Sequence, residues 1–349
     1  MQRRKERDLR KMKFLVTGGA GYIGAVTTRM LLDAGHQVVV LDTLEKGHRK
    51  AVDRRARLVV GDVGDGRALD EAFAAFPELG GDGGGSVGGC DAVMHLAGYI
   101  EVAESQAEPG RYFENNVSRP LVMLRAMAER GVRAICFSST AAVYGEPEAV
   151  PITEESPTRP INAYGASKLM FEELLEWFGR LQGLRSVRFR YFNVAGAWPD
   201  GSLGEAHQPE THIVPRILQA MAAGREEFQV YGSDYPTKDG TCVRDYIHVA
   251  DLGLAHRLGL EWLVAGNESG VFNLGNGRGF SNLEVVRTCA EVTGREVRIE
   301  LGPRRAGDPA VLVASSERAR RVLGWEPERS RLGQIIGDAW EWHRRQLEA

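Results

Sequence analysis

The stretch KFLVTGGAGYIG, residues 13–24, decides the fold of this 349-residue chain. A short β-forming run leads directly into a turn with four glycines, and an apolar helical pattern then continues to about Ala34. A glycine turn at such a junction lets the backbone approach a pyrophosphate, which the free N–H groups at the start of the helix can bind. We therefore predict a dinucleotide-binding turn formed by Gly18, Gly21, Tyr22, Ile23 and Gly24.

An aspartate ends the next predicted strand, Gln37–Asp42. A carboxylate at this place can accept hydrogen bonds from an adenosine ribose and repels a 2′-phosphate, which favours NAD over NADP. Asp62 follows the third predicted strand, Arg57–Val60, where it could receive the adenine amino group. Taken alone, Asp62 would more often be a turn residue.

The same alternation of strands and helices continues along the chain, with further strands predicted at residues 92–96, 134–138, 185–190 and 271–274. Near-continuous apolar strands separated by helices indicate a parallel sheet that is covered on both faces. We predict an α/β fold, a Rossmann-type doubly wound parallel sheet with a smaller C-terminal substrate-binding lobe. The predicted parts are a flexible basic leader (1–12), an NAD-binding domain (13–194) with a mobile glycine-rich loop (80–89), and a smaller second lobe (195–349) of which about 243–276 returns to the sheet.

Composition and charge exclude several classes of protein. Hydrophobic residues make up 43% and charged residues 26%, the balance of a globular enzyme. A net charge of −3 argues against nucleic-acid binding, which needs a concentrated positive face. No run approaches 18 apolar residues, so we expect no membrane span. The four cysteines have no metal-ligand spacing, so we expect no metal centre and a cytoplasmic location.

A second motif, YGASK at 164–168, begins a helix predicted over Tyr164–Gln182. The spacing of four residues places Tyr164 and Lys168 on one helix face. A tyrosine that acts as a base near neutral pH must lower its pKa by about three units, roughly 4 kcal/mol. One cation about 4 Å away can supply this, and both Lys168 and the positive ring of oxidised NAD are candidates. Thr140, which follows the strand 134–138, can hydrogen-bond the same substrate hydroxyl.

These motifs, with others along the chain, resemble the UDP-glucose 4-epimerase family of extended short-chain dehydrogenases/reductases. The matching segments are TGGAGYIG (17–24), HLAGYIEVAES (95–105), NNV (115–117), SSTAAVYG (138–145), YGASK (164–168), RYFNVAGA (190–197), DYPTKDGTCVRDYIHVADL (234–252), NLG (273–275) and RRAGD (304–308). The resemblance runs from about Lys13 to about Pro327. It implies bound NAD, a UDP-sugar substrate oxidised transiently to a 4-keto sugar, and catalysis by Tyr164, Lys168 and Thr140. It also implies a homodimer that pairs the helices around Arg111–Arg130 and Tyr164–Gln182.

The resemblance further assigns contacts to individual residues. On the adenosine side of NAD they are Tyr22, Ile23, Asp42, Thr43, Leu44, Glu45, Lys46, Gly47, Asp62 and Val63. On the nicotinamide side they are Leu96, Ala97, Gly98, Tyr99, Ile100, Asn115, Tyr164, Lys168 and Phe192. Around the UDP-sugar they are Thr140, Tyr164, Asn193, His212, Ile213, Gln229, Val230, Tyr231, Arg244, Arg305, Asp308 and the pocket gate Leu312. Two of them, Arg244 and Arg305, can clamp a diphosphate through charge-assisted hydrogen bonds.

Three of these positions depart from the family pattern and leave the exact sugar open. His212 stands where the best-known members have asparagine, Ile100 replaces a lysine of some members, and Leu312 is intermediate between a restrictive tyrosine and smaller residues. A 4-epimerase of UDP-N-acetylglucosamine or of a UDP-pentose is therefore an alternative. A sugar-nucleotide dehydratase or decarboxylase is disfavoured because Ala141 and Ala142 stand where those enzymes usually carry an acidic residue. A plain dehydrogenase that releases NADH would need added cofactor and would accumulate reduced product. A non-catalytic NAD sensor would have little reason to keep Tyr164, Lys168 and Thr140 together.

Overall fold

The computed structural model describes residues 11–76, 89–225, 227–304 and 309–348. Seven strands form the main sheet in the order β10-β6-β5-β4-β1-β2-β3, and every neighbouring pair is parallel. Their bounds are β1 Lys13–Thr17, β2 Gln37–Asp42, β3 Arg57–Val60, β4 Ala92–His95, β5 Ala134–Ser138, β6 Arg185–Tyr191 and β10 Gly270–Leu274. The predicted Rossmann-type parallel sheet is confirmed.

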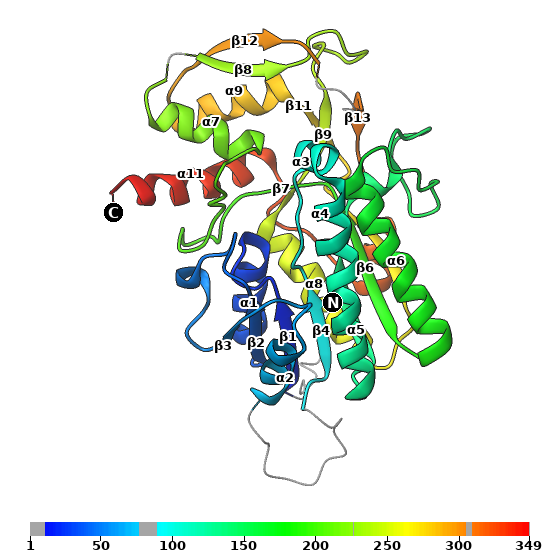
Figure 1. The fold of residues 1–349 in the computed structure, drawn as a ribbon. Helices are drawn as coiled ribbons and strands as arrows, with labels where there is room; N and C mark the ends of the chain where they lie inside the picture. Colours follow the sequence, from blue (N-terminus) through cyan, green and yellow to red (C-terminus); the bar gives the residue numbers. More distant parts are fainter. Residues whose placement is uncertain (1–10, 77–88, 226, 305–308, 349) are drawn as a thin grey trace, which may run out of the picture.

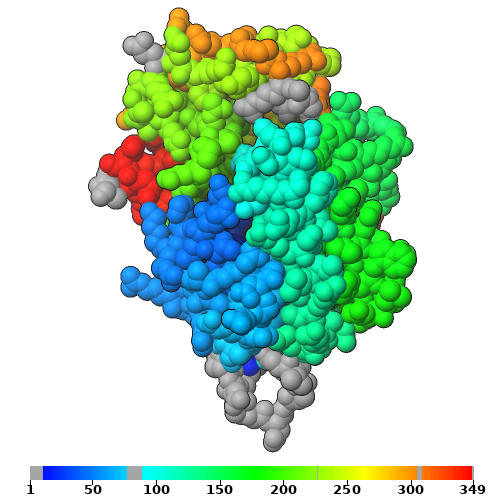
Figure 2. Space-filling model, in the orientation of Figure 1, coloured from blue at the N-terminus to red at the C-terminus, as the bar shows by residue number. Residues whose placement is uncertain are grey.

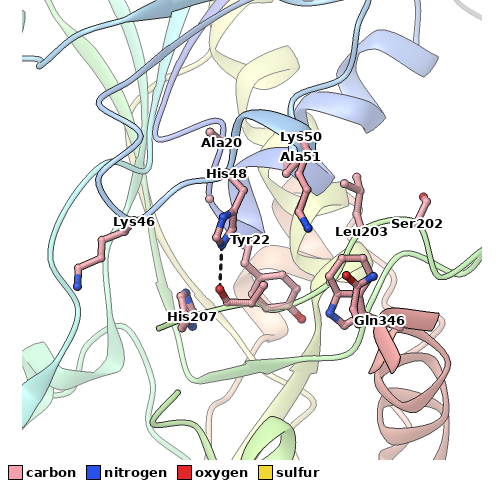
Figure 3. A pocket seen from close by; sticks show the side chains of 15 residues that line it. Ala20, Tyr22, Lys46, His48, Lys50, Ala51, Ser202, Leu203, His207 and Gln346 are labelled. Carbon is pink, nitrogen blue, oxygen red and sulfur yellow. Dashed lines mark hydrogen bonds between the residues drawn. The ribbon is translucent and has the colours of Figure 1, made fainter. Parts of the chain in front are cut away.

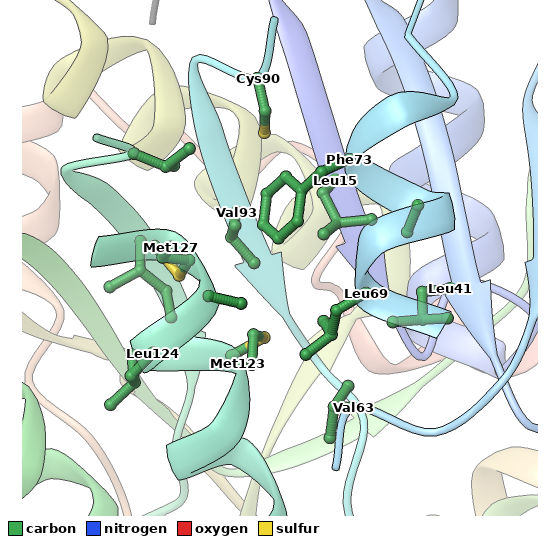
Figure 4. Close-up of a cluster of buried hydrophobic side chains, with 14 of the residues drawn as sticks. Leu15, Leu41, Val63, Leu69, Phe73, Cys90, Val93, Met123, Leu124 and Met127 are labelled. Atoms are coloured by element: carbon green, nitrogen blue, oxygen red, sulfur yellow. The ribbon is translucent and has the colours of Figure 1, made fainter. Parts of the chain in front are cut away.

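Helices cover both faces of this sheet (Figure 1). The helices that pack against it are α1 (Tyr22–Asp33), α8 (Val249–Val264) and α10 (Glu317–Leu323) on one face, and α2 (Gly66–Ala74), α5 (Arg119–Glu129) and α6 (Ala163–Gln182) on the other. Side chains alternate along each strand, so Leu15 joins one core while Phe14 and Val16 join the other. Figure 4 shows the first core, in which Phe73 of α2 lies beside Val93 of β4, and Met123 of α5 lies beside Leu69 of α2.

A second lobe lies beyond the carboxyl ends of the main strands (Figure 1). It contains a four-stranded sheet of β7 (Asn193–Ala195), β9 (Val243–His248), β11 (Gly279–Ser281) and β13 (Val311–Leu312), and a pair of β8 (Glu227–Tyr231) and β12 (Arg298–Gly302). Its helices α7 (Ile213–Ala222), α9 (Asn282–Thr293) and α11 (Leu332–Glu348) share one apolar core. Of the segment 243–276, α8 and β10 return to the main sheet, whereas β9 pairs with β7, β11 and β13.

The remaining short elements lie near the edge where the two lobes meet. They are the 3-10 turns η1 (Arg49–Ala51) and η3 (Ala141–Tyr144), the helices α3 (Val102–Ala107) and α4 (Pro109–Phe113), and the π-helical turn η2 (Glu114–Ser118). Figure 2 shows a recess on this face, between the blue and cyan segments of the main lobe.

The start of the described chain corrects the predicted leader at one residue. Met12, assigned to the flexible leader 1–12, is only 5% exposed, because its apolar side chain packs in the core beside β2. Residues 1–10, and residues 80–88 of the predicted glycine loop, lie outside the described residues. Among the described helices, none is long and apolar enough to cross a membrane.

Candidate active site

The glycine turn between β1 and α1 brings backbone atoms too close together for any side chain. Gly18 has φ +75°, and a Cβ on it would lie 2.6 Å from the nitrogen of Ala97. A Cβ on Gly24 would lie 2.1 Å from the carbonyl oxygen of Gly18. Gly21 precedes the first turn of α1, and no side chain among the described residues caps that end of the helix. The N–H groups of Tyr22 and Ile23 therefore face an anion-binding position.

Asp42 organises the loop that follows β2. Its carboxylate accepts hydrogen bonds from the backbone N–H groups of Ala20 at 2.9 Å and Leu44 at 2.8 Å. The second bond holds Leu44 at φ +62°, a left-handed conformation that is uncommon outside glycine. Each carboxylate oxygen keeps a free lone pair, so Asp42 can still accept from a ribose. Gly47 packs closely here, since a Cβ on it would lie 2.9 Å from Asp42 Oδ1.

Two of the predicted loops, 42–47 and 96–100, meet through side chains. The Tyr99 hydroxyl donates to Glu45 at 3.0 Å, and Arg111 also donates to Glu45 at 3.1 Å. The guanidinium of Arg111 stacks 4.3 Å from the centre of the Tyr99 ring. The predicted adenosine-side and nicotinamide-side residues thus lie on one continuous edge of the sheet. Ile100 is 39% exposed at the end of this edge.

Asp62 lies on the same edge but already has partners. Its carboxylate accepts from Arg119 at 2.8 Å and from the backbone N–H of Gly64 at 2.7 Å. Val63 beside it is buried in the core below α2. The arginine pairing gives Asp62 a structural role in addition to any contact with an adenine.

The first two turns of α6 carry Tyr164 and Lys168 to the end of β5. Asn162 caps this helix by accepting from the N–H of Gly165 at 2.8 Å. A Cβ on Gly165 would lie 2.5 Å from the carbonyl oxygen of Ala142, so α6 and η3 approach each other unusually closely. This contact sets Tyr164, which is 9% exposed, against Thr140, and the two side chains are hydrogen-bonded.

The other two members of the trio are held by the backbone around η3. Thr140 Oγ1 accepts from the N–H of Ala142 at 3.1 Å, which leaves its proton to donate toward the Tyr164 oxygen. Lys168 is 3% exposed, and its Nζ donates to the carbonyl oxygen of Ser138 at 3.1 Å. The predicted trio therefore converges at one edge of the sheet.

Burial shifts the pKa of two members of the trio. It raises the pKa of Tyr164 to about 12, against the opposing effect of the Thr140 hydrogen bond, and Glu101 adds to the rise. It also lowers the pKa of Lys168 to about 8. The lowering of the Tyr164 pKa that the sequence analysis ascribed to Lys168 or to the ring of oxidised NAD stays a prediction.

A buried polar network, which the sequence analysis missed, holds the segment after β5. Glu172 of α6 accepts from Arg190 of β6 at 2.6 Å and from the hydroxyl of Ser139. Arg190 also donates to the Tyr144 hydroxyl at 3.1 Å, which in turn donates to Asn273 at 2.7 Å. The network joins both sides of Thr140, so it fixes the position of that hydroxyl relative to Tyr164.

Asn116 is a second residue that the sequence analysis did not single out. It lies in the π-helical turn η2, is 3% exposed, and its Oδ1 accepts from the N–H of Tyr99 at 2.9 Å. Its amide donates to Ser167 of the YGASK motif at 3.0 Å. The predicted neighbour Asn115 accepts from the same N–H at 3.1 Å. The signal was present in the NNV segment, and π-helical turns are frequent at functional sites.

The second lobe brings several predicted substrate residues above this edge. Phe192 and Leu312 pack in one small apolar cluster with Ala141, Val143 and Tyr144, directly after Thr140. Asn193 pairs with Tyr246 across β7 and β9. Arg244 is 8% exposed and donates to the carbonyl oxygen of Pro309 at 2.8 Å.

The other predicted substrate residues differ in whether their side chains could reach a ligand. Val230 turns its side chain into the core, so only its backbone could contact a ligand, whereas Gln229 and Tyr231 occupy the opposite face of β8. Ile213 begins α7 and packs against the core of the second lobe. Arg305 and Asp308 lie outside the described residues.

His212 precedes α7 and faces carboxylates. Its Nδ1 is 2.6 Å from Glu205 Oε1. Burial opposes the charged form of His212, but Glu205 and Glu210 outweigh it and raise the pKa of His212 to about 9. This nitrogen is therefore directed at a glutamate, and only the other side of the ring could meet a substrate.

A pocket of about 170 Å³ lies beside the glycine turn. Figure 3 shows Tyr22, Lys46, His48 and His207 around it. Its lining includes none of residues 96–100 and no member of the catalytic trio, so it adjoins the phosphate end of the predicted dinucleotide site and not the reacting groups. The glycine cradle, the uncapped start of α1 and the carboxylate at the end of β2 together fit a dinucleotide.

Comparisons with known proteins agree with this arrangement. The profile described as NAD dependent epimerase/dehydratase family matches residues 14–275. A UDP-glucose 4-epimerase from Lacticaseibacillus casei is 51% identical over 337 residues, which is 97% of this chain and 98% of that protein. A solved structure of a UDP-glucose 4-epimerase superimposes with a TM-score of 0.90 at 46% identity, covering 97% of this chain and 99% of the other.

A further solved structure supplies a bound cofactor and nucleotide. It is the UDP-glucose 4-epimerase from Bifidobacterium longum in complex with NAD+ and UDP, with a TM-score of 0.87 at 34% identity, covering 96% of this chain and 99% of the other. Sequence, fold and site geometry lead to one assignment. The chain belongs to the NAD dependent epimerase/dehydratase family.

Proposed function

We propose that this chain is an NAD-dependent 4-epimerase that interconverts UDP-galactose and UDP-glucose. The observation that carries the proposal is the convergence of Tyr164, Thr140 and Lys168 at the carboxyl edge of the main sheet, below the second lobe. The similarity to UDP-glucose 4-epimerases over nearly the whole chain supports the same reaction. The NAD contacts we propose are the residues that the sequence analysis assigned along this edge.

Each group of the trio has a role in moving one proton. NAD, when bound, would supply the redox chemistry, which is the uptake of a hydride from C4 of the sugar and its return to the opposite face. Tyr164, as phenolate, takes the proton from the C4 hydroxyl and gives it back when the 4-keto sugar is reduced. Thr140 holds that hydroxyl and the tyrosine oxygen in one hydrogen-bonded line. Net redox change is zero, because the sugar regains the hydride and the proton that it lost.

The pKa of Tyr164 sets a requirement on this mechanism. Burial raises this pKa to about 12 with Lys168 already in place, and a base that works near neutral pH needs a lower pKa. A positive charge close to the phenol favours its deprotonated form. The ring of oxidised NAD, when bound beside Tyr164, would add such a charge.

The second lobe would hold the nucleotide while the sugar stays free to turn. Arg244, with Arg305 from the predicted set, can clamp the diphosphate, and Tyr231 offers an aromatic face to uracil. Firm binding of the remote nucleotide keeps the ketone captive without fixing the reacting ring. Leu312 packs beside Phe192 in the apolar cluster after Thr140, a place from which it would limit the size of the sugar substituent.

A dehydratase or decarboxylase is the less favoured reading of the same fold. Ala141 and Ala142 begin η3 directly after Thr140, and their methyl groups cannot serve as the extra acid or base that elimination needs. We also place the protein in the cytoplasm, where its four buried thiols would remain reduced.

The function is tested by incubating the purified protein with UDP-galactose and no added NAD. We expect UDP-glucose to form with no net NADH, measured by product chromatography and absorbance at the reduced-cofactor band. UDP-N-acetylgalactosamine and UDP-arabinose in parallel reactions rank the alternative sugars. Formation of a dehydrated or decarboxylated product, or stoichiometric NADH, would contradict the proposal.

We further propose a homodimer formed through α6. Met170, Leu174, Trp177 and Leu181 follow one another at spacings of four, three and four residues, the seam of a helix that packs against a second helix. Met170 is 46% exposed, Trp177 56% and Leu181 75%, an unusual apolar stripe for an uncovered surface. Figure 1 shows α6 at the outer edge of the main lobe. A second copy of this chain, presenting the same stripe, would cover it.

Trp177→Lys and Leu181→Lys should each convert the dimer to monomer, because a buried unpaired ammonium disfavours the interface. Light scattering after gel filtration should give twice the 38.3-kDa chain mass for the parent protein and the single mass for both variants. Leu347→Lys on α11, also exposed, is the matched control and should leave the mass unchanged. A parent protein of single-chain mass would rule out the dimer.

A further inference from the structure

The segment between β7 and α7 carries two glutamates and two histidines with their ligating atoms turned toward one point. Glu205, His207, Glu210 and His212 each offer one atom, and these atoms lie within 4.8 Å of one another. His212 Nδ1 is 2.6 Å and His207 Nδ1 is 3.1 Å from Glu205 Oε1. His207 Nδ1 is also 3.9 Å from Glu210 Oε2. Both imidazoles therefore present the same nitrogen to the same pair of carboxylates.

The two carboxylates of the cluster are buried, whereas the side chains of His207 and His212 are 24% and 46% exposed. The side chains of Glu205 and Glu210 are each 5% exposed. Glu210 Oε1 accepts from the backbone N–H groups of Thr211 and His212, whereas Glu210 Oε2 is buried and has no hydrogen-bond partner among the described residues. A carboxylate oxygen left in this state costs free energy unless a cation or a proton satisfies it. Glu210 is thus a nearly fully buried polar side chain directed into the cluster with one oxygen unsatisfied.

We propose that Glu205, His207, Glu210 and His212 bind a divalent transition-metal ion, with Zn²⁺ as the best fit. Two imidazole nitrogens and two carboxylate oxygens suit zinc, whereas Mg²⁺ and Ca²⁺ prefer oxygen ligands alone. Tetrahedral Zn²⁺ places its nitrogen and oxygen ligands at about 2.0–2.2 Å, hence about 3.4 Å from one another. His207 Nδ1 lies near that value from both carboxylates, at 3.1 and 3.9 Å, and all four ligating atoms lie within 4.8 Å of one another. Two carboxylates also balance the charge of a divalent ion.

The position of the cluster indicates a structural role for the ion. With four protein ligands the coordination is complete, as in structural zinc sites, and no open position remains for a substrate. The ligands come from one segment of eight residues that also contacts three other parts of the protein. Ala206 accepts from His48 at 2.9 Å, Glu205 accepts through its backbone from Trp342 at 3.1 Å, and Thr211 donates to Glu101 at 3.1 Å.

These contacts determine what the ion would fix. His48 follows the loop of the predicted adenosine side, Trp342 belongs to α11, and Glu101 follows the predicted nicotinamide-side residues. An ion bound by the cluster would hold the segment that leads from the main sheet to the second lobe in place against His48, Trp342 and Glu101. This inference does not rest on the epimerase reaction, since no member of the catalytic trio belongs to the cluster.

The test uses untagged full-length protein, treated with a chelator and then titrated with Zn²⁺. We expect one zinc per chain by elemental analysis after gel filtration, and a visible absorption band of tetrahedral Co²⁺ when cobalt replaces zinc. Glu210→Gln and His207→Gln should each weaken Zn²⁺ binding by more than about 100-fold, because even outer-shell partners contribute about 10- to 100-fold. Glu296→Gln changes an exposed glutamate that follows α9 and lies outside the cluster; it is the matched control and should bind zinc as the parent does.

A thermal-unfolding readout separates a built site from incidental binding. Zn²⁺ should raise the Tm of the chelator-treated parent and of Glu296→Gln, but not that of Glu210→Gln or His207→Gln. Near-UV circular dichroism establishes that both cluster variants remain folded. Zinc well below one per chain in the parent, or equal zinc binding by the parent and both cluster variants, would overturn the proposal. Neither result depends on whether the protein epimerises a sugar.

Discussion

Tyr164→Phe should reduce turnover of UDP-galactose by about 10²- to 10⁴-fold, the range that a positioned acid–base group contributes. The substitution removes the hydroxyl that we propose exchanges the C4 proton and leaves the ring in place. Burial raises the pKa of Tyr164 to about 12, and Thr140 positions its hydroxyl. A water molecule that replaced this hydroxyl would not be positioned by Thr140 in the same way. The loss should appear in kcat, because the proton is transferred in the transition state and not on binding.

Three measurements accompany this variant. The amount of NAD that copurifies and the Kd for UDP should stay within about twofold of the parent, since neither involves the transferred proton. Tyr235→Phe, a buried tyrosine outside the trio, is the matched control and should keep parental turnover. A Tyr164→Phe enzyme within tenfold of the parent would remove this residue from the mechanism.

Gly24→Ala should abolish retention of NAD and destabilise the fold. Its new methyl group would lie 2.1 Å from the carbonyl oxygen of Gly18 and 2.8 Å from Cα of Gly19. Both atoms belong to the backbone, so relief requires α1 to move away from β1. That movement opens the turn in which the phosphates would lie, and overpacking of this kind costs about 1–3 kcal/mol of unfolding free energy or more.

The matched control for this prediction is Gly337→Ala. Gly337 lies within α11, and a Cβ there meets nothing within 4 Å. The control should keep its cofactor and gain up to about 1 kcal/mol, because alanine favours a helix over glycine. Denaturant unfolding and the ratio of absorbance at 260 and 280 nm check both variants. A Gly24→Ala protein that retains NAD and the parental midpoint would show that the turn is not the cofactor cradle.

The parts of the fold that follow local rules could be predicted closely. The strands at Gln37–Asp42, Arg57–Val60 and Ala134–Ser138 have the predicted bounds, because apolar β-branched runs end at glycine, proline or polar turns. The start of α1 follows from glycine geometry alone. The trio at Thr140, Tyr164 and Lys168 was predicted because parallel strands end at one edge and a helix repeats every 3.6 residues.

The features that could not be predicted depend on contacts between distant segments. The network from Glu172 to Arg190 and Asn273 joins residues 18 and more positions apart, and single charged residues in a sequence more often form surface pairs. The pKa of Tyr164 depends on burial, which spacing does not reveal. The expectation of no metal centre considered only cysteines, so it passed over the closely spaced glutamates and histidines at 205–212. Only the folded segment shows that these four side chains face one another.

The central claim is that C4 of the sugar is oxidised and reduced within one closed site. It is tested most directly with UDP-galactose that carries deuterium on C4, converted by the purified protein in ordinary water and followed by mass spectrometry and proton NMR. We predict that the UDP-glucose formed retains the deuterium on C4, and that a parallel reaction in ¹⁸O-labelled water leaves the C4–O bond intact. Loss of the deuterium to solvent would contradict this account. Incorporation of ¹⁸O at the C4 hydroxyl faster than a ketone exchanges its oxygen with water would contradict it as well.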